Sequence, residues 1–360
     1  MLKKSKVEYV ASRFGDEHFK LRQDSFEKIF DEIHPSIVFL DSFIGNDFIP
    51  LYKHLVNRNV KLNFINTMAI FEDKGLPALN SPLVPDQKLK IIIDKLKNRI
   101  LVSWHKILET IALIGNSSDR IVQRQIRISK IPEYHRPLTN GSLGTTYSKI
   151  PELVLGIKEF EFKMLDTPDR HYIGFRPSLK RYEFIKVDQI TRLKQVVQAS
   201  DKIVYISFGT LYSNTKKELL RLIEIIFNYA NEVPNISFIF SNMSKSIIEK
   251  IALETPSNVF LFGFIPQTAV LSKSDIFITH GGMNSIRESI HSTVPMLVFP
   301  IKDGYDQIGN AARVAFHKLG LAGHLHNISK ARLGEMIMEL INTPMYKENL
   351  ERFKIRSESQ

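Results

Sequence analysis

The residues best suited to do chemistry in this sequence lie in one stretch, residues 264–310. Within it, the run THGGMNS follows an apolar, strand-like segment and opens a helical one. The run supplies an imidazole, a glycine turn, an amide and a hydroxyl: His280, Gly281, Gly282, Asn284 and Ser285. Backbone N–H groups at a helix N-terminus attract anions, and an imidazole and a hydroxyl beside them strengthen such a site. The run therefore predicts a phosphate-binding turn.

Two further features extend this turn toward a nucleotide. Gly209 and Thr210 end another strand-like run, KIVYISF, where glycine permits close backbone approach and the threonine hydroxyl can reach a phosphate. Glu288 lies one helical turn beyond Asn284 and Ser285 on the same face, where its carboxylate can accept hydrogen bonds from ribose hydroxyls. The alternative interpretations are a structural histidine, a solvated helix charge and an ordinary turn. The combination favours a nucleoside diphosphate site.

The elements that must position these residues follow a regular pattern from about residue 202 onward. Apolar runs predict strands at residues 202–208, 235–240, 258–262, 275–280, 294–300 and 320–325. Amphipathic stretches between them predict helices, apart from a short turn at residues 268–271. Apolar strands that alternate with helices are typical of a parallel, doubly wound sheet with both faces covered. We therefore expect a complete Rossmann-like domain in this half.

The first half of the chain is less regular. Residues 34–42 and 60–67 predict two parallel strands joined by a helix at about residues 47–57, and a helix-rich stretch follows at about 86–115. Later strands are predicted at 152–162 and 171–175, and the basic run at 120–130 is interpreted as a solvated face or a strand edge. The expected domains are residues 1–175 and 201–360, with a linker over 176–200.

The order of several motifs in the stretch 264–310 resembles that of a known family. The order of aromatic-x-Pro-Gln at 264–267, Thr-His-Gly-Gly-x-Asn-Ser, Glu288, Val-Pro, and Asp-Gln with a following Asn resembles the donor-binding signature of the UDP-glycosyltransferase superfamily. The sequence looks most like the bacterial macrolide-type and related small-molecule glycosyltransferases. The resemblance implies an α/β architecture, the GT-B fold, with two Rossmann-like domains that each contain a parallel sheet.

The resemblance also implies a role for each matching position. The positions divide by the part of the donor that they would hold: uracil by Phe264 and Ile265, the ribose by Gln267 and Glu288, the diphosphate by His280, Asn284 and Ser285 with Thr210, and the sugar hydroxyls by Asp306 and Gln307. Asp306 has a compatible alternative role as the cap of the next helix. No metal is expected, because helix termini and His280 would carry the diphosphate.

In such enzymes a histidine after the first N-terminal strand deprotonates the acceptor hydroxyl, and an aspartate orients that histidine. The run IVFLDSF makes Asp41 the matching aspartate, with a cap at a strand end as the alternative. Only His18 and His34 precede it, both in a charged, helical-looking stretch, so neither matches the base. Relatives have about three βα units upstream, each of about 30 residues. We therefore expect an incomplete N-terminal domain and a chain that is also short at its C-terminal end.

Composition narrows the remaining possibilities. The formal net charge of +11 is spread over both halves without one basic patch, which argues against a nucleic-acid partner but is compatible with attraction to an anionic substrate or a membrane surface. The chain has no cysteine, so disulfides and thiolate metal sites are excluded. Neither an apolar run long enough to span a membrane nor a signal-peptide pattern is present, and a cytoplasmic location is expected.

The leading hypothesis is an inverting glycosyltransferase that moves a hexose from a UDP-sugar to a hydroxyl of a small, apolar acceptor, with no cofactor. The second hypothesis is a catalytically silent remnant that binds nucleotide sugar and lacks the base histidine. A lipid glycosyltransferase and a UDP-sugar 2-epimerase are further alternatives. Neither the acceptor nor the sugar can be identified from these residues.

Overall fold

The structure is a computed structural model. It describes residues 16–69, 75–139, 144–163, 168–174, 187–209, 217–241, 255–301 and 305–358. The chain divides into two compact units, which are treated separately. The first, called the four-strand unit, comprises Met1–Thr67, Gln87–Leu155 and Leu165–Tyr172. The second, called the six-strand unit, comprises Met68–Asp86, Gly156–Met164 and Ile173–Gln360.

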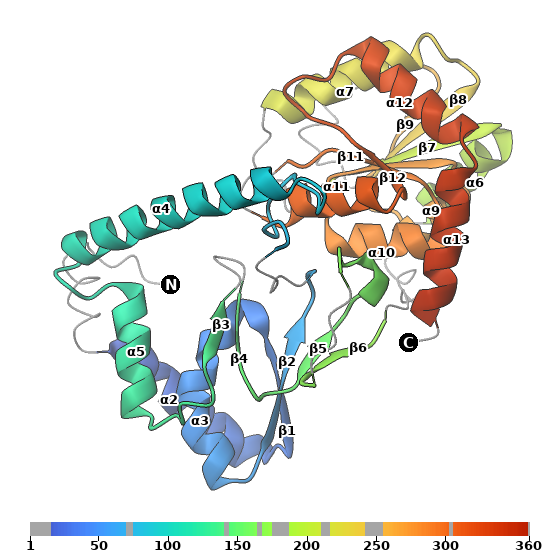
Figure 1. Cartoon of the computed structure of the whole chain (residues 1–360). Coiled ribbons are helices and arrows are strands. Elements are labelled where there is room, and N and C mark those ends of the chain that lie inside the picture. Colours follow the sequence, from blue (N-terminus) through green and yellow to red (C-terminus); the bar gives the residue numbers. More distant parts are fainter. Residues whose placement is uncertain are drawn as a thin grey trace. The chain divides into compact units, whose positions relative to one another are not determined.

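The six-strand unit is built on one parallel sheet (Figure 1). Its strands are β7 (Lys202–Ser207), β8 (Ile236–Ser241), β9 (Val259–Leu261), β10 (Ile276–Thr279), β11 (Met296–Val298) and β12 (Gly320–Ala322). They lie in the order β12-β11-β10-β7-β8-β9, and all five neighbouring pairs are parallel. The strands predicted for this half are confirmed: β8 is displaced by one residue, and the other five are shorter than predicted.

Helices cover both faces of this sheet. Those in the described part of the unit are α6 (Val187–Ala199), α7 (Lys217–Ala230), α9 (Gln267–Leu271), α10 (Met283–Ser292), α11 (Gln307–Phe316), α12 (Lys330–Asn342) and α13 (Met345–Glu358), with a 3-10 turn, η2 (Lys158–Phe160). Figure 1 shows α7 and α12 on one face and α10 and α11 on the other. The main core lies beneath α7 and α12, where Ile206, Phe238 and Ile278 of the sheet meet Ile223 and Ile337. Both faces of the sheet are thereby buried, as apolar parallel strands require.

The strand order places a topological switch point between β7 and β10. From β7 the chain builds outward through β8 and β9, and it then returns to build β10, β11 and β12 on the other side. In doubly wound sheets, ligands bind beyond the carboxyl ends of the strands at such a switch point. The residues after β7 and β10 are therefore the first place to look for a site.

The four-strand unit has a smaller parallel sheet in the order β1-β2-β5-β6. Its strands are β1 (Ile37–Asp41), β2 (Lys61–Asn66), β5 (Glu152–Val154) and β6 (Arg170–Tyr172), and a separate hairpin pairs β3 (Pro137–Thr139) with β4 (Thr145–Tyr147). The remaining elements are α2 (Glu17–Ile33), η1 (Ser42–Asp47), α3 (Phe48–Asn57), α4 (Lys88–Ala112) and α5 (Ser118–Ile128). A core of aromatic and aliphatic side chains, including Phe30, Phe48, Phe64 and Tyr147, joins α2 and α3 to the sheet.

Three sequence-based predictions need correction. The strand predicted over residues 152–162 ends at Val154, and the chain turns through η2 instead. The basic run at 120–130 is neither a strand edge nor wholly solvated, because it lies mostly in α5 and buries Ile121 and Gln125. The turn at 268–271 belongs to the short helix α9. Within the expected linker, residues 187–199 form α6, while residues 176–186 lie outside the described part of the chain.

Candidate functional site

The carboxyl ends of β7 and β10 bring a histidine and three glycines together. A Cβ atom added to Gly209, after β7, would lie 3.0 Å from His280 Cε1, and one added to Gly282 would lie 2.5 Å from His280 Nε2. Gly281 has a φ of 84°, and a Cβ there would lie 2.7 Å from Val298 Cγ1. Glycine is thus needed at Gly281 for its backbone conformation, and at Gly209 and Gly282 because the imidazole lies against their backbone.

Helix α10 starts immediately after this turn with an uncapped N-terminus. Its N-cap residue is Gly282, which offers no side chain to the first-turn N–H groups, and the first helical bond runs from Ile286 N to Gly282 O at 3.1 Å. A helix terminus of this kind carries partial positive charge and unsatisfied donors. The half-buried imidazole of His280 lies beside it. This arrangement can bind a phosphate-like anion.

The side of α10 that faces the sheet carries two of the predicted polar residues. Ser285 and Glu288 are both buried, and Gln267 donates a hydrogen bond from Nε2 to Ser285 Oγ at 3.3 Å. Burial raises the pKa of the Tyr205 hydroxyl, and the negative charge of Glu288 adds to that shift. Asn284 is exposed instead, and its Oδ1 accepts from Arg287 NH1 at 3.3 Å. The structure therefore brings Gln267, Ser285 and Glu288 to one region and leaves Asn284 at the surface.

The Asp306-Gln307 pair lies at the start of α11 and is tied to the glycine turn. Asn310 Nδ2 donates both to Asp306 Oδ2 at 2.8 Å and to Gly281 O at 2.9 Å. Asp306 is the N-cap residue of α11, but its side chain makes no capping hydrogen bond. Burial raises the pKa of Asp306, and hydrogen bonding by Asn310 opposes that shift. The predicted sugar-binding carboxylate is thus coupled to the phosphate turn through one amide.

The side chain of Gln307 is turned toward the backbone. Its Oε1 accepts from Ile301 N at 2.9 Å, and the residue is buried. This bond holds the end of the segment that follows β11 against the first turn of α11. The sequence-based prediction placed Gln307 on sugar hydroxyls, and the structure assigns its amide oxygen to this backbone contact.

Sequence reasoning missed two buried arginines near Asp306. Burial lowers the pKa of Arg287 to about 10, while the charge of Asp306 opposes that shift. Arg313, only 2% exposed, lies 3.6 Å from Glu161 Oε2 and stacks over the ring of Phe162 at 4.4 Å. Both arginines lie on buried faces of their helices. The apolar residues Ile286 and Ile290 stand at helical spacing, which indicates that this part of α10 is buried and that Arg287 lies within it.

Three predicted donor residues remain. Two of them follow β9, the edge strand of the sheet, and the third lies outside the described residues. Phe264 is 49% exposed in the turn between β9 and α9, so its ring is accessible for stacking, whereas the Ile265 side chain is buried. Thr210 lies outside the described residues. The predicted site residues that the structure places close together are therefore Gly209, His280, Gly281 and Gly282, followed along α10 by the buried Ser285 and Glu288.

In the four-strand unit, Asp41 ends β1 and caps the turn that follows. Its Oδ1 accepts from Phe43 N at 2.8 Å, which is the capping role considered as an alternative. His18 lies on the exposed surface of α2, and His34 is the exposed C-cap residue of the same helix. Neither stands after a strand, in agreement with the expectation that neither is the base.

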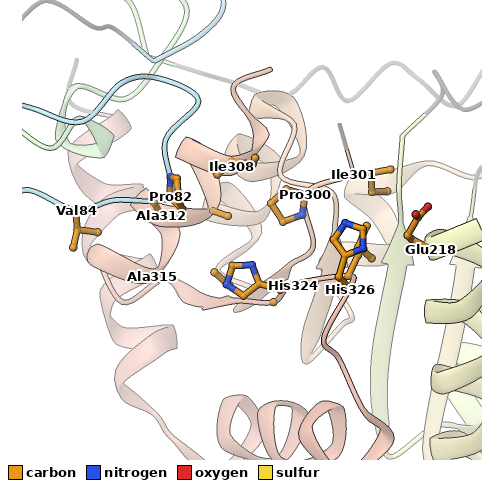
Figure 2. Close-up of a pocket in the computed structure, with 14 residues that line it drawn as sticks. Pro82, Val84, Glu218, Pro300, Ile301, Ile308, Ala312, Ala315, His324 and His326 are labelled. Carbon is orange, nitrogen blue, oxygen red and sulfur yellow. The ribbon is translucent and has the colours of Figure 1, made fainter. Parts of the chain in front are cut away.

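A separate cavity of about 570 Å³ opens at the carboxyl ends of β11 and β12 (Figure 2). Apolar side chains such as Pro300, Ile301 and Ala312 form much of its wall, and the imidazoles of His324 and His326 lie at one side. Segment 75–86 contributes Pro82 and Val84. None of the predicted donor residues lines this cavity, which has a volume typical of small-molecule sites.

The described residues contain neither a metal-binding cluster nor a membrane-spanning helix. No cluster of three or more His, Asp or Glu side chains there is arranged to hold a metal ion. None of the described helices has the length and apolarity needed to cross a membrane.

Comparison with known proteins shows what the part of the chain that holds this geometry is similar to. Residues 186–356 match the family model described as UDP-glucoronosyl and UDP-glucosyl transferase. The chain is 35% identical over 100 residues to the uncharacterized UDP-glucosyltransferase YdhE of Bacillus subtilis (strain 168), a match that covers 28% of this chain and 24% of that protein. It is 27% identical over 208 residues to UDP-glucuronosyltransferase 2C1 of Oryctolagus cuniculus, which covers 55% of this chain and 37% of that protein.

A solved structure, the glycotransferase of kitacinnamycin, has a TM-score of 0.68 at 17% identity and covers 99% of this chain and 80% of that one. At this identity the likeness shows the fold, which is the GT-B fold with parallel-sheet domains. The matched part spans well under half the length of the curated relatives named above. Residues 186–356, which contain the glycine turn, His280 and the polar face of α10, are therefore similar to the UDP-glucoronosyl and UDP-glucosyl transferase family.

Proposed function

We propose that this protein is a UDP-sugar-dependent hexosyltransferase. The observation that carries the proposal is the position of the His280-Gly281-Gly282 turn. It lies at the switch point of the six-stranded sheet, directly before the uncapped N-terminus of α10. That is the place where a doubly wound sheet binds the phosphates of a nucleotide. The family match to residues 186–356 supports UDP as the nucleotide.

Within this proposal the donor is held from uracil to sugar along the edge of the sheet. The exposed ring of Phe264 stacks on uracil, Gln267 and Glu288 hold the ribose, and His280, Asn284 and Ser285 bind the diphosphate. The Asp306 carboxylate accepts hydrogen bonds from hydroxyls of the hexose. No cofactor takes part. Transfer breaks the bond between the anomeric carbon and the diphosphate oxygen, with inversion at that carbon. The N–H groups of α10 and His280 stabilise the negative charge on the leaving UDP.

The acceptor in this proposal is a hydroxyl of a small, apolar molecule. A general base takes the proton from the hydroxyl as it attacks the anomeric carbon, and Asp41 orients that base. The strand-end position of Asp41 supports its assignment, while its bond to Phe43 N supports a structural role at the same time. The base itself is not identified among the described histidines.

Three other functions make different predictions for the same site. A silent remnant binds UDP and UDP-sugars but transfers nothing. A UDP-sugar 2-epimerase converts UDP-N-acetylglucosamine without any acceptor. A lipid glycosyltransferase uses the same donor site and accepts only a lipid hydroxyl. The Phe264–Gln267 and Asp306–Gln307 elements favour a transferase over the epimerase.

The test incubates the chain with UDP-glucose or UDP-glucuronate and a panel of apolar alcohols and phenols, and measures UDP release and glycoside formation by mass spectrometry. The expected result is a glycoside of inverted anomeric configuration. The Asp41→Asn variant is expected to bind UDP as tightly as wild type and to lose transfer by about 100-fold or more. UDP binding with no product from any acceptor would replace the transferase with the silent remnant, and a product of retained configuration would contradict the mechanism.

A further inference from the structure

Helix α4 of the four-strand unit carries an apolar stripe along one face. Its members follow each other at intervals of three or four residues: Leu89, Ile93, Leu96, Ile100, Trp104, Ile107 and Ile111. Side chains at this spacing stand on the same side of a helix. All seven are exposed, although such a stripe normally faces a protein core. The helix therefore presents a continuous apolar surface to its surroundings.

The exposure is a property of the whole middle of the helix. Every residue from 96 to 108 is exposed, and Ile91 is the single buried residue of α4. The C-terminal end is attached to the following helix, where Glu109 Oε1 accepts from Ser118 N at 2.9 Å and from Ser118 Oγ at 2.7 Å. Figure 1 shows α4 as a long helix that leads into α5. The stripe is thus held at both ends and uncovered between them by described residues.

The charges of α4 are strongly unbalanced. The helix contains six Lys and Arg residues and two acidic residues, a net charge of +4. At 100° per residue, Lys90 and Lys97 border the stripe on one side and Arg99 borders it on the other. Glu109 lies on the opposite side of the helix, where it holds Ser118. An apolar strip with basic margins is the pattern of helices that lie in the surface of an anionic membrane.

The position of the only tryptophan agrees with this pattern. Trp104 is the single tryptophan of the chain, it lies in the middle of the stripe, and it is 60% exposed. Tryptophan is costly to leave in water and is enriched where a protein meets the headgroup region of a bilayer, because its ring is apolar and its N–H can still be hydrogen bonded. A surface built to remain in water would not place its largest aromatic side chain there.

We propose that α4 is a membrane-binding helix that lies in the plane of an anionic lipid surface, with its apolar stripe among the acyl chains and its basic margins among the headgroups. Charge complementarity decides between this occupant and a second copy of the chain. Two copies paired through the stripe would bring Lys90, Lys97 and Arg99 of each helix near like charges, and Asp94, four residues after Lys90, is the one acidic side chain of α4 beside these margins. This inference does not depend on the proposed donor site.

The test uses Trp104 as the reporter, so no label is needed. The full chain is titrated with vesicles of equal parts phosphatidylcholine and phosphatidylglycerol, and with vesicles of phosphatidylcholine alone. We expect the tryptophan emission to shift to shorter wavelength and the chain to co-sediment with the anionic vesicles. Binding should be at least about tenfold weaker to the neutral vesicles and should weaken at about 0.5 M salt.

A matched pair of variants separates the stripe from charge alone. I100E/I107E places two carboxylates in the apolar stripe. N98E/V102E places two carboxylates on the opposite side of the helix. All four positions are exposed. The first is expected to lose at least about tenfold in vesicle binding relative to the second. UDP titration of both is expected to match wild type, so failure of this inference leaves the donor site untouched.

Three results would overturn the proposal. One is no spectral shift and no co-sedimentation with anionic vesicles. A second is equal loss of binding in both variants, which would reduce the effect to net charge. The third is a concentration-dependent dimer in sedimentation equilibrium that I100E/I107E abolishes, because the stripe would then be covered by a second copy of the chain.

Discussion

The two parallel sheets of this molecule share a strand geometry and differ in how they are covered. Every residue of β10 and β11 is buried, as are five of the six in β7. In β1, by contrast, Leu40 is the one buried residue, and Phe39 is 51% exposed. Helices on both faces bury the central strands of the six-stranded sheet, while β1 is an edge strand with exposed residues such as Phe39.

The same comparison explains where the chemistry-bearing residues are well positioned. His280 and its glycines continue from a fully buried strand, and Asn310 and Gln307 fasten the next loop by buried hydrogen bonds. Asp41 continues from the half-covered β1, and its carboxylate accepts a hydrogen bond from Phe43 N in the exposed turn that follows. Precise placement of a site requires supporting residues that are themselves locked by packing. The six-strand unit meets that requirement more fully.

The largest expected effect tests this difference in coverage directly. Phe277→Ala in β10 removes a fully buried ring that stacks on Tyr205 at 5.1 Å, and it should lower the free energy of unfolding by about 3–5 kcal/mol. The matched Phe39→Ala in β1 should cost less than about 1 kcal/mol. Chemical denaturation followed by circular dichroism measures both. Equal losses would show that the two sheets are equally covered in solution.

A second prediction concerns ion pairs. Here the four-strand unit, and not the six-strand unit, is expected to lose more stability on mutation. In the four-strand unit, Arg170 Nε lies 3.0 Å from Glu152 Oε2, and both side chains are at most 9% exposed. Arg170→Met leaves a buried carboxylate without its cation and should cost about 3 kcal/mol. Lys202→Met breaks the exposed pair with Asp275 at the six-stranded sheet and should cost less than about 1 kcal/mol. The two losses are measured from denaturant midpoints, provided that the dependence of unfolding free energy on denaturant concentration is unchanged. A larger loss for Lys202→Met than for Arg170→Met would refute the prediction.

Acid should destabilise the six-strand unit through His317. Burial lowers the pKa of His317 from 6.5 to about 4, so the unfolded chain binds the proton more readily than the folded one. Stability from this group is complete above pH 6.5 and is lost as the pH falls toward 4, by about 3 kcal/mol at most. His317→Gln should flatten that part of the stability–pH curve. His54→Gln in the four-strand unit, whose pKa burial lowers less strongly, should flatten it less, and the opposite ranking would contradict this account.

The smallest expected effect concerns the glycine turn. Gly282→Ala places a methyl group 2.5 Å from His280 Nε2, so the imidazole must move, and UDP should bind about tenfold more weakly. Gly263→Ala is the control, because its added methyl would lie 4.0 Å from Gln189 Nε2, an ordinary contact. Calorimetric titration with UDP measures both. An unchanged affinity in Gly282→Ala would mean that the position of His280 does not matter for the nucleotide.

Local pattern predicts much of the six-strand unit. Runs such as KIVYISF and DIFITH are apolar, rich in β-branched and aromatic residues, and bounded by turns, so β7 and β10 follow from sequence alone. The same rule fails at residues 152–162, because an apolar run does not reveal that only its first part finds a partner strand. The run at 120–130 fails for the converse reason, since its charges conceal a helical spacing of Ile121 and Gln125.

The site divides in a similar way. The glycine turn and the start of α10 can be predicted because a short motif determines them locally. The contact of Asp306 with Asn310 is also local, because the two are one helical turn apart at the start of α11. The charge of Arg287 near Asp306 and the bond from Ile301 N to Gln307 could not be predicted, because they depend on how separate segments pack. Asn284 and Ser285 show the limit most clearly: they are adjacent in the motif, yet one is exposed and the other buried.

The central claim is that the switch point of the six-stranded sheet is a UDP site, and calorimetric titration with UDP tests it most directly. Wild type is expected to bind, and His280→Ala to bind at least about tenfold more weakly. His324→Ala, in the cavity beyond β12, is expected to bind like wild type. The claim would be contradicted if wild type released no heat of binding, or if His280→Ala bound UDP as tightly as wild type.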